Sequence, residues 1–286
     1  MKTRIYFIAL SLLCLLPLAA QVAVHGIAVK NPDKTFIGAV MEHKSINSNT
    51  HRFVDIAVPE PIRIYFSLPV KQQTIVPTYE NMMKTVRESV MASGKIKTNH
   101  GFSFQLLEIE SYDRLSWFFG QTMDTETFLG ISPNTKLQKT TVAVNMTQSF
   151  FSIGMDFPED GKLYDKDPEI TKRADELIYV STLFFGRKIT AVVESAATFT
   201  ELKTAIEESL NSQGKPVSQK SRAVLANADI RFMTLGATEL PEPDSENPFA
   251  SVMAYFNKPV TMDDFGVPLG FHAAYIKDNS AFANEY

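Results

Sequence analysis

One long alternating segment, Thr140 to Met155, most constrains how this chain can fold. Apolar and polar side chains alternate along most of it, which is the two-residue period of an extended strand. One side would carry Val142, Val144, Met146 and Phe150, and the other Thr141, Ala143, Asn145, Thr147 and Ser149. At about 3.3 Å per residue the strand would be about 50 Å long, whereas ordinary strands have about five or six residues. This length favours a large bent sheet or a barrel wall over a compact sandwich.

Further strands are predicted before and after this segment. Residues 177–185 and 189–194 are rich in β-branched and aromatic side chains, and Gly186-Arg187-Lys188 between them has the composition of a tight turn. We therefore expect these two strands to form a hairpin. The other strand candidates are residues 62–68, 102–106, 224–235 and 267–275.

Two helices are indicated by their first residues and by a 3.6-residue period. The first begins at Pro77 or Thr78 and ends at Gly94, and its apolar face carries Tyr79, Met82, Met83, Val86, Val90 and Met91. The second opens with Thr198 and Glu201, which have capping-box spacing. Its apolar face carries Phe199, Leu202, Ile206 and Leu210. Because 44% of the chain is hydrophobic, both faces are expected to pack on a sizeable core.

Residues 1–20 have the pattern of an export signal peptide. Lys2 and Arg4 precede an almost wholly apolar run, residues 5–18, and the following small residues offer a cleavage site. This run is shorter than the roughly 20 residues of a spanning helix, so we expect cleavage rather than a membrane anchor. Cys14, the only cysteine, lies within the run. The exported chain would then lack disulfides, and the alternative is that Cys14 accepts a lipid.

The composition and the missing motifs exclude several classes of function. A net charge of −4 leaves no basic excess for binding nucleic acid. The five histidines show no metal-ligand spacing, and Asp165, Asp167 and Glu169 lack the glycine and later glutamate of a calcium loop. The sequence also contains no phosphate loop, nucleophile elbow or dinucleotide fingerprint. We therefore expect neither an enzyme nor a bound cofactor or metal.

Several stretches resemble the cholesterol-dependent cytolysins. Residues 178–189, Ile-Tyr-Val-Ser-Thr-Leu-Phe-Phe-Gly-Arg-Lys-Ile, are similar to a strand of these toxins that ends in Tyr-Gly-Arg, with Phe185 in place of the tyrosine. Pro77-Thr78-Tyr79 resembles a helix start of the family. The stretches 139–158, 227–236 and 267–286 resemble further strands and the end of its pore-forming core. The resemblance covers about residues 60–286 with its order preserved.

This resemblance implies an α+β fold with a bent, twisted, four-stranded antiparallel central sheet flanked by helical bundles. Residues 21–286 would form the pore-forming core, with a scaffold from about 21–138 and 250–286 around a sheet with hairpin-forming helices at about 139–249. The family's C-terminal membrane-recognition domain has no counterpart before the sequence ends. Direct cholesterol binding is therefore not expected.

The resemblance also implies functional residues. Its two membrane hairpins would come from residues 157–176 and 207–229. The lipid-facing side chains would be Phe157, Leu163, Val224, Ala226, Ala228, Ile230 and Phe232. Bending would occur at Gly186, Arg187, Gly236 and Ala237, where the family has Gly-Gly at the last two positions. Phe151 and Ile230 would contact neighbouring subunits.

A two-residue period tests these hairpins against the residues themselves. With Leu225 as the exception, the stretch from Val224 to Phe232 alternates as a lipid-facing strand should. Pro158 and Glu159 interrupt the pattern in the first segment, and residues 207–210 hardly alternate. Helices that never insert therefore remain an alternative, as does plain core packing of Phe151 and Ile230.

The function implied is that of a secreted β-barrel pore-forming protein, the short subunit of a two-component pore. Its partners would be further copies of itself or a longer cytolysin-like paralogue, and a lipid bilayer after assembly. Backbone groups cannot stay unpaired in lipid, which is why closed barrels are one of two spanning solutions. The alternatives are a non-lytic binding or immunity protein on the same scaffold, and an exported enzyme with an unrecognised site.

Overall fold

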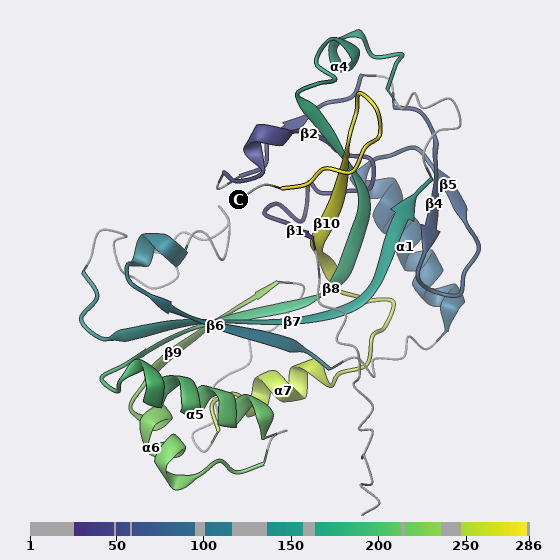
Figure 1. The fold of residues 1–286 in the computed structure, drawn as a ribbon. Helices are drawn as coiled ribbons and strands as arrows, with labels where there is room; N and C mark the ends of the chain where they lie inside the picture. Colours follow the sequence, from purple (N-terminus) through teal and green to yellow (C-terminus); the bar gives the residue numbers. More distant parts are fainter. Residues whose placement is uncertain are drawn as a thin grey trace, which may run out of the picture.

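A computed structural model describes residues 26–48, 50–57, 59–94, 101–115, 136–156, 164–212, 215–235 and 247–284. Two long antiparallel strands run through the molecule, β7 (Thr140–Met155) and β8 (Leu177–Ser195). They pair from Thr140 opposite Ser195 to Gly154 opposite Thr182, with a bulge at Phe150. Figure 1 shows both strands curving from one half of the sheet into the other. The predicted long strand is confirmed with the expected bounds.

The predicted hairpin around Gly186 is wrong, because β8 is one continuous strand of 19 residues. Gly186, Arg187 and Lys188 lie opposite Ser149, Gln148 and Thr147 of β7. A tight turn would leave these positions without ladder partners. The long neighbouring strand supplies partners on both sides of Gly186, so the chain continues instead of reversing.

One half of the sheet has four antiparallel strands in the order β6, β7, β8, β9. The outer strands are β6 (Ser103–Ile109), which pairs with β7, and β9 (Asp229–Leu235), which pairs with β8. The expected four-stranded antiparallel sheet is therefore present. In the other half the order is β1 (Ile27–Ala28), β10 (Val267–Tyr275), β8, β7, β4 (Ile62–Phe66) and β5 (Gln73–Ile75), and β2 (Val40–Glu42) pairs with β8 and with β3 (Phe53–Val54).

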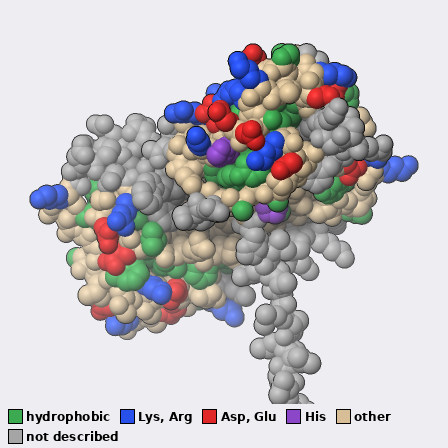
Figure 2. Space-filling view, turned by 45° about the horizontal axis from the view of Figure 1, so that its top comes forward, with side chains coloured by type: hydrophobic (Ala, Val, Ile, Leu, Met, Phe, Trp, Pro, Cys, Tyr) green, Lys and Arg blue, Asp and Glu red, His purple; other side chains and the backbone are tan. Residues whose placement is uncertain are grey.

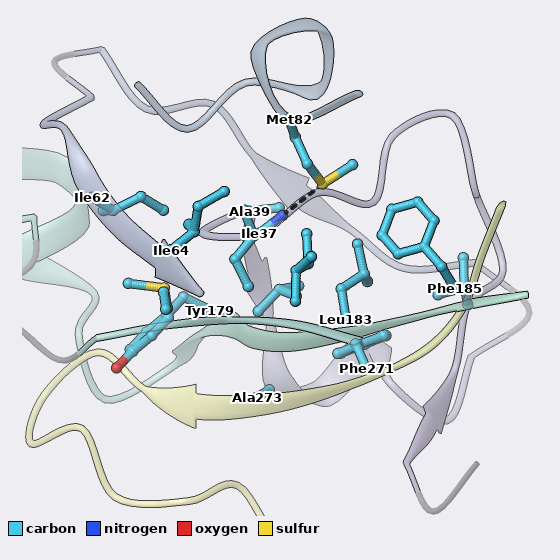
Figure 3. Close-up of a cluster of buried hydrophobic side chains, with 14 of the residues drawn as sticks. Ile37, Ala39, Ile62, Ile64, Met82, Tyr179, Leu183, Phe185, Phe271 and Ala273 are labelled. Carbon is cyan, nitrogen blue, oxygen red and sulfur yellow. Dashed lines mark hydrogen bonds between the residues drawn. The ribbon is translucent and has the colours of Figure 1, made fainter. Parts of the chain in front are cut away.

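The half that contains β10 and β4 encloses the first core. Helix α1 (Tyr79–Ser93) starts at Thr78, whose hydroxyl accepts a hydrogen bond from the Asn81 amide at 3.2 Å. Met82 of this helix reaches the sheet and accepts a hydrogen bond from the Ile37 amide through its sulfur (Figure 3). The predicted helix is confirmed, and its buried side chains pack over fully buried strand residues including Ile64, Tyr179, Leu183, Phe185 and Phe271.

Three helices cover one face of the four-stranded half and enclose the second core. They are α5 (Phe199–Asn211), α6 (Gln219–Ala226) and α7 (Ala250–Phe256), drawn below the sheet in Figure 1. The capping box of Thr198 and Glu201 is present, as predicted. The core beneath these helices includes Val144, Ile189, Val193, Leu202, Ile206 and Phe249.

The predicted strand at residues 224–235 begins later than expected. Residues 224–226 belong to α6, and β9 starts at Asp229. Ser218 caps α6 by accepting from the Ser221 amide, and Leu225 is buried in the second core. A helical period that buries Ser221 and Leu225 therefore prevails over the two-residue alternation seen in the sequence.

Short elements complete the described chain. They are the 3₁₀ turns His43–Ser45 and Tyr112–Arg114 and helix α4 (Pro168–Lys172). A small third cluster lies on the face of the four-stranded half opposite α5, with Ile109, Tyr112, Leu115, Ala143 and Val192 at its centre. Within the described residues, no helix is both long and apolar enough to cross a bilayer.

Candidate functional site

Two connecting segments leave the same end of the four-stranded half. Residues 110–139 join β6 to β7, whose ladder ends with Ile109 opposite Thr141. Residues 196–228 join β8 to β9, whose ladder ends with Glu194 opposite Asp229. Thr140 and Ser195 are themselves paired, so both connections begin at one edge. This edge is the candidate site, because each segment sits between two strands that it could lengthen.

The segment 157–176, predicted as the first hairpin, does not share this edge. It joins Met155 of β7 to Leu177 of β8, at the end where Gly154 lies opposite Thr182. A turn at Gly186 would have brought it to the same end as residues 196–228, whereas the continuous strand β8 puts the two segments at opposite ends, and a membrane hairpin from 157–176 stays a prediction. Phe157 and Leu163 lie outside the described residues.

The described part of 157–176 is tied to the first core. The Tyr164 hydroxyl donates a hydrogen bond to the Gly38 carbonyl, and burial raises the pKa of Tyr164 far above its usual value. Asp167 caps α4 and also accepts from the Ala57 amide at 2.9 Å, which lowers its pKa. These contacts hold residues 164–167 against the segments around Gly38 and Ala57.

The other predicted lipid-facing residues lie on two different elements. Val224 is half-buried and Ala226 is exposed on α6, and Ala228 is half-buried in the turn that follows. Only Ile230 and Phe232 are on a strand, β9. Val224, Ala228 and Ile230 pack at the margin of the second core, and Phe232 is buried in it. In this conformation Val224, Ala228, Ile230 and Phe232 therefore pack in or beside the core on one face of the sheet. A lipid-facing role would require α6 to unfold and become extended.

The sheet bends where three backbones approach closely. A Cβ placed on Gly186 would lie 2.0 Å from the Gln148 carbonyl oxygen, and one on Gly266 would lie 2.2 Å from the Gly186 oxygen. Gly266 also has a φ of +80°, which favours glycine. The β7 bulge lies directly opposite. Gly186 therefore lies at a close backbone approach within one continuous strand, and a hinge there stays a prediction, whereas Gly236 and Ala237 lie outside the described residues.

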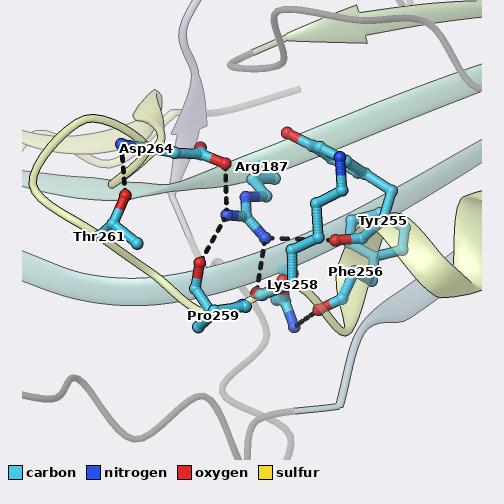
Figure 4. A network of polar contacts seen from close by, with 8 residues as sticks. Arg187, Tyr255, Phe256, Lys258, Pro259, Thr261 and Asp264 are labelled. Carbon is cyan, nitrogen blue, oxygen red and sulfur yellow. Dashed lines mark hydrogen bonds and ion pairs between the residues drawn. The ribbon is translucent and has the colours of Figure 1, made fainter.

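Arg187, expected in a turn, is completely buried at this bend. Its guanidinium donates to the Asp264 carboxylate at 2.7 Å and to three backbone carbonyls, of Tyr255, Lys258 and Pro259 (Figure 4). Its terminal carbon lies 4.9 Å from the ring centres of both Phe150 and Tyr255. Burial raises the pKa of Tyr255 to about 12, and the positive charge of Arg187 opposes this rise. A buried guanidinium requires extensive pairing, which the two terminal nitrogens of Arg187 make, while its Nε has no hydrogen-bond partner among the described residues.

Phe151, predicted at a subunit contact, is part of the first core. Its ring stacks on Phe185 of the neighbouring strand with centres 5.0 Å apart, and both side chains are buried. Ile230, predicted at the same contact, is half-buried beside the second core. In this conformation both residues have the packing role given as the alternative, and a subunit contact stays a prediction.

A buried polar pair between Tyr112 and Glu194 escaped the sequence analysis. Tyr112 donates its hydroxyl to Glu194 at the end of β8, and Thr141 lies 3.5 Å from the same carboxylate oxygen. Burial and this hydrogen bond raise the pKa of Tyr112 to about 12. The pair fastens the beginning of segment 110–139 to the sheet. The sequence signal for this pair is Glu194 itself, a charged residue near the end of a strand of mostly apolar residues.

A cavity of about 650 Å³ lies beside β2, β3 and the beginning of α1, in the half of the molecule that contains the first core. Its wall includes Phe36, Phe53 and Tyr79 together with Asp33 and Asp55. Its lining residues come from 31–40, 50–56, 59 and 77–79, apart from the candidate edge. Within the described chain, no group of three or more His, Cys, Asp or Glu residues could hold a metal ion.

Charges on the face in Figure 2 are mixed in sign. Lysine and arginine side chains lie among aspartates and glutamates, with hydrophobic side chains between them. This mixture agrees with the small net charge of −4. The described surface on this face therefore presents no extended single-sign field.

Comparison with solved structures finds this fold in several toxins. Pneumolysin aligns with a TM-score of 0.68 and 15% identity over 90% of this chain and 59% of its own. Listeriolysin O aligns with a TM-score of 0.69 and 14% identity over 89% of this chain and 58% of its own. A non-hemolytic pneumolysin from Streptococcus pneumoniae aligns with a TM-score of 0.64 and 16% identity over 90% and 60%.

Searches with the sequence match no family model and no curated protein. At such low identities the likeness concerns the fold, and the chain spans about three fifths of the length of these structures. The fold likeness extends over about nine tenths of this chain. The chain therefore has the same fold as these cytolysin structures, pneumolysin and listeriolysin O among them.

Proposed function

We propose that this chain is a secreted pore-forming protein in which residues 110–139 and 196–228 convert into two membrane-spanning hairpins. The observation that carries the proposal is their common edge. Each segment connects two adjacent antiparallel strands at that edge. Extending β6 and β7, and likewise β8 and β9, would turn each segment into the tip of a longer hairpin without changing any existing strand pair.

Length and backbone chemistry support this conversion. A spanning strand needs about 9–11 residues, so each segment is long enough for two. Within lipid every backbone N–H and C=O must be paired, and extended hairpins that join side by side into a closed barrel satisfy all of them. With Leu225 as the exception, the stretch from Val224 to Phe232 already has the alternation of a lipid-facing strand. Its first residues, which now belong to α6 and the turn after it, would be added to the beginning of β9.

Before conversion, the second segment is folded largely as the helices α5 and α6. Leu202, Ile206 and Leu210 of α5 are buried against the sheet, so their apolar surface is hidden from water until the helix leaves. Conversion needs a source of free energy, and contacts between subunits are the natural one. We propose that those subunits are further copies of this chain or a longer cytolysin-like paralogue, with this chain as the short component.

A disulfide lock tests the conversion of the second segment. Ser209 of α5 contacts Asn247, which lies outside the segment, through a buried hydrogen bond. Ser209→Cys with Asn247→Cys would tie α5 in place when oxidised. Asn145→Cys with Thr190→Cys is the matched control, because these residues join β7 to β8, and their side chains are 2.8 Å apart in strands that stay paired. Both pairs belong in a Cys14→Ser background.

The measurement is dye release from liposomes, with this chain alone and mixed with a longer cytolysin-like paralogue. We expect the oxidised Ser209–Asn247 pair to abolish release, dithiothreitol to restore it, and the control pair to release dye in both states. Release that is unaffected by the lock would rule out conversion of residues 196–228. No release from any mixture would rule out the pore-forming proposal as a whole.

The second candidate is a non-lytic binding protein on the same scaffold. Two observations favour it: a non-hemolytic pneumolysin shares this fold, and a cavity with aromatic and acidic walls lies near Tyr79. This candidate predicts no dye release from the locked, reduced or control proteins, and a binding activity that the Ser209–Asn247 lock leaves unchanged. Dye release that the lock abolishes and reduction restores therefore supports the pore-forming function over this one.

A further inference from the structure

The cavity beside β2, β3 and the beginning of α1 has the size and the composition of a ligand site. Its volume of about 650 Å³ lies within the range of about 300–1,000 Å³ that is common for pockets that bind small molecules. Three half-buried aromatic side chains, Phe36, Phe53 and Tyr79, line it together with two exposed carboxylates, Asp33 and Asp55. The pore-forming function gives this cavity no role.

Hydrogen bonds hold the segments that carry these side chains. Thr35, which is completely buried, donates its hydroxyl to the Asn31 carbonyl at 2.7 Å, and two backbone amides of the same turn donate to that carbonyl as well. Phe53 belongs to β3, which pairs with β2. Tyr79 is the first residue of α1 and follows the capping Thr78 directly. The walls are therefore largely preformed, which lowers the free-energy cost of binding.

The two carboxylates at the cavity have no ion-pair partner in the part of the chain that the structure describes. Lys34 is the only Lys or Arg among the described lining residues. Burial raises the pKa of Tyr79, and the negative charge of Asp33 raises it further. The Asp33 carboxylate therefore lies close enough to the Tyr79 ring to act on it.

His51 contributes a buried, uncharged wall. The side chain is 4% exposed, its ring centre lies 5.5 Å from that of Phe271 and 6.4 Å from that of Phe53, and neither ring nitrogen has a hydrogen-bond partner among the described residues. Burial, and then the positive charge of Lys30, lowers the pKa of His51 to about 4. The Lys30 ammonium itself donates to the Ile46 carbonyl at 2.7 Å and does not line the cavity. At neutral pH this wall thus adds no positive charge, and it contains a buried polar group left unpaired by the described chain, which is uncommon.

Aromatic faces and unpaired carboxylates together favour one class of ligand. The face of an aromatic ring is negative and attracts a cation, and a carboxylate adds a full negative charge. Quaternary ammonium groups suit such sites, because their methyl groups pack on the rings while the charge is spread over them. An anionic ligand would meet two carboxylates and a single lysine, and a neutral ligand would gain nothing from these charges.

We propose that this cavity binds a small organic cation with a trimethylammonium group, such as choline. The methyl groups would lie against the rings of Phe36, Phe53 and Tyr79, and the Asp33 and Asp55 carboxylates would lie beside the charge. The cation would be either free choline or the headgroup of a choline lipid. This site goes beyond the pore-forming function and does not depend on it, because its residues are in place in the conformation described above.

Calorimetric titration of choline into the lipid-free protein tests the site. We expect saturable binding with a Kd of about 1 mM or tighter, a modest affinity for so small a ligand. The neutral tert-butyl isostere of choline, in which carbon replaces the nitrogen, should bind at least about tenfold more weakly. No saturation up to about 20 mM choline, or equal affinity for the isostere, would overturn the proposal.

Matched substitutions test the contacts. Tyr79→Leu removes a ring and Tyr79→Phe keeps it, so we expect choline binding at least about fivefold weaker in the first and changed less than about twofold in the second. Asp33→Asn and Asp55→Asn should each weaken it at least about threefold. The control is Asp229→Asn on β9, the same change at a 46% exposed side chain in the other half of the molecule.

Equal binding by the two Tyr79 variants, or by the cavity aspartate variants and the Asp229→Asn control, would contradict the assigned contacts. The aspartate variants keep the test valid if Tyr79→Leu fails to fold, because Asp33 and Asp55 are exposed.

Glycerophosphocholine distinguishes the two sources of the cation. It carries the same trimethylammonium group next to a phosphate ester. Binding at least as tight as that of choline would identify a lipid headgroup as the ligand. Weaker binding would identify the free cation, because the phosphate would be repelled by both carboxylates. Either result upholds the cation site, and binding of neither compound would overturn it.

Discussion

At the residue scale, single buried polar groups fasten the ends of the two connecting segments to the sheet. On the face opposite α5, Tyr112 and Glu194 form a hydrogen-bonded pair inside an apolar cluster with Ile109 and Leu115. Because a buried carboxylate costs free energy unless it is paired, the phenol is the group that makes Glu194 tolerable there. This pair fastens the start of segment 110–139 at the candidate edge.

Removing this phenol should loosen the segment. Tyr112→Phe leaves the buried Glu194 carboxylate without its main donor, so we expect a loss of about 1–3 kcal/mol in the free energy of unfolding, measured in urea. The raised pKa of Tyr112 also sets a direction with pH. The stabilisation is complete below the ordinary tyrosine pKa of 10.0 and is lost as pH rises toward 12.

The matched control is Tyr65→Phe, which removes a phenol from a ring that is 42% exposed. Its stability should change by less than about 0.5 kcal/mol, and its pH dependence should equal that of the wild type. If both variants lost the same stability, or if Tyr112→Phe kept the wild-type slope between pH 10 and 12, the role given to the Tyr112–Glu194 pair would be wrong.

At the scale of elements, the continuity of β8 decides which segments can act together. A strand that passes through Gly186 without turning puts residues 164–176 at one end of the molecule and residues 196–212 at the other. The kink is possible because glycine allows the Gln148 carbonyl to approach where a side chain would stand. The continuity of β8 therefore sets the location of the candidate edge, and glycine at position 186 permits the close approach of β7 along the way.

Gly186→Ala should disturb this kink. The added methyl would lie 2.0 Å from the Gln148 oxygen, and both atoms belong to the paired backbones, so the strands must separate. We expect a loss of about 2–3 kcal/mol in the free energy of unfolding, measured by urea denaturation. Gly101→Ala is the control, because a Cβ there meets nothing within 4 Å. Equal stability of the two variants would contradict the close backbone approach.

At the scale of the whole molecule, two cores share the same pair of strands. The first core lies under α1 and the second under α5, and β7 and β8 contribute side chains to both. Backbone pairing between β7 and β8 runs almost without interruption from one core into the other. We therefore expect the two halves to unfold together, although each has its own helices.

Core truncations in the two halves test this coupling. Met82→Ala in the first core and Leu202→Ala in the second each remove a completely buried side chain, so each should cost about 2–5 kcal/mol. Both variants should keep one transition that coincides in far- and near-ultraviolet circular dichroism. Two separate transitions, with only one shifted by each substitution, would show that the halves are independent.

Local patterns in the sequence were sufficient to predict the elements whose periodicity and capping contacts lie within a few residues of each other. Strand β7 follows from its own alternation, α1 from Thr78 and its apolar face, and α5 from the box formed by Thr198 and Glu201. The antiparallel sheet and the cytolysin-like fold followed from the order of these elements and the resemblance that they carry. Each of these signals is contained in a short stretch of chain.

Contacts between distant segments decided the rest. Whether Gly186 turns or kinks depends on β7, which lies opposite it and pairs on both sides. Whether residues 224–226 form a strand or a helix depends on the core into which Leu225 packs. The sequence by itself determined the strands and helices with local periods. The tertiary structure alone placed the ends of segments 110–139 and 196–228 at one edge, because strand pairing joins residues that are far apart along the chain.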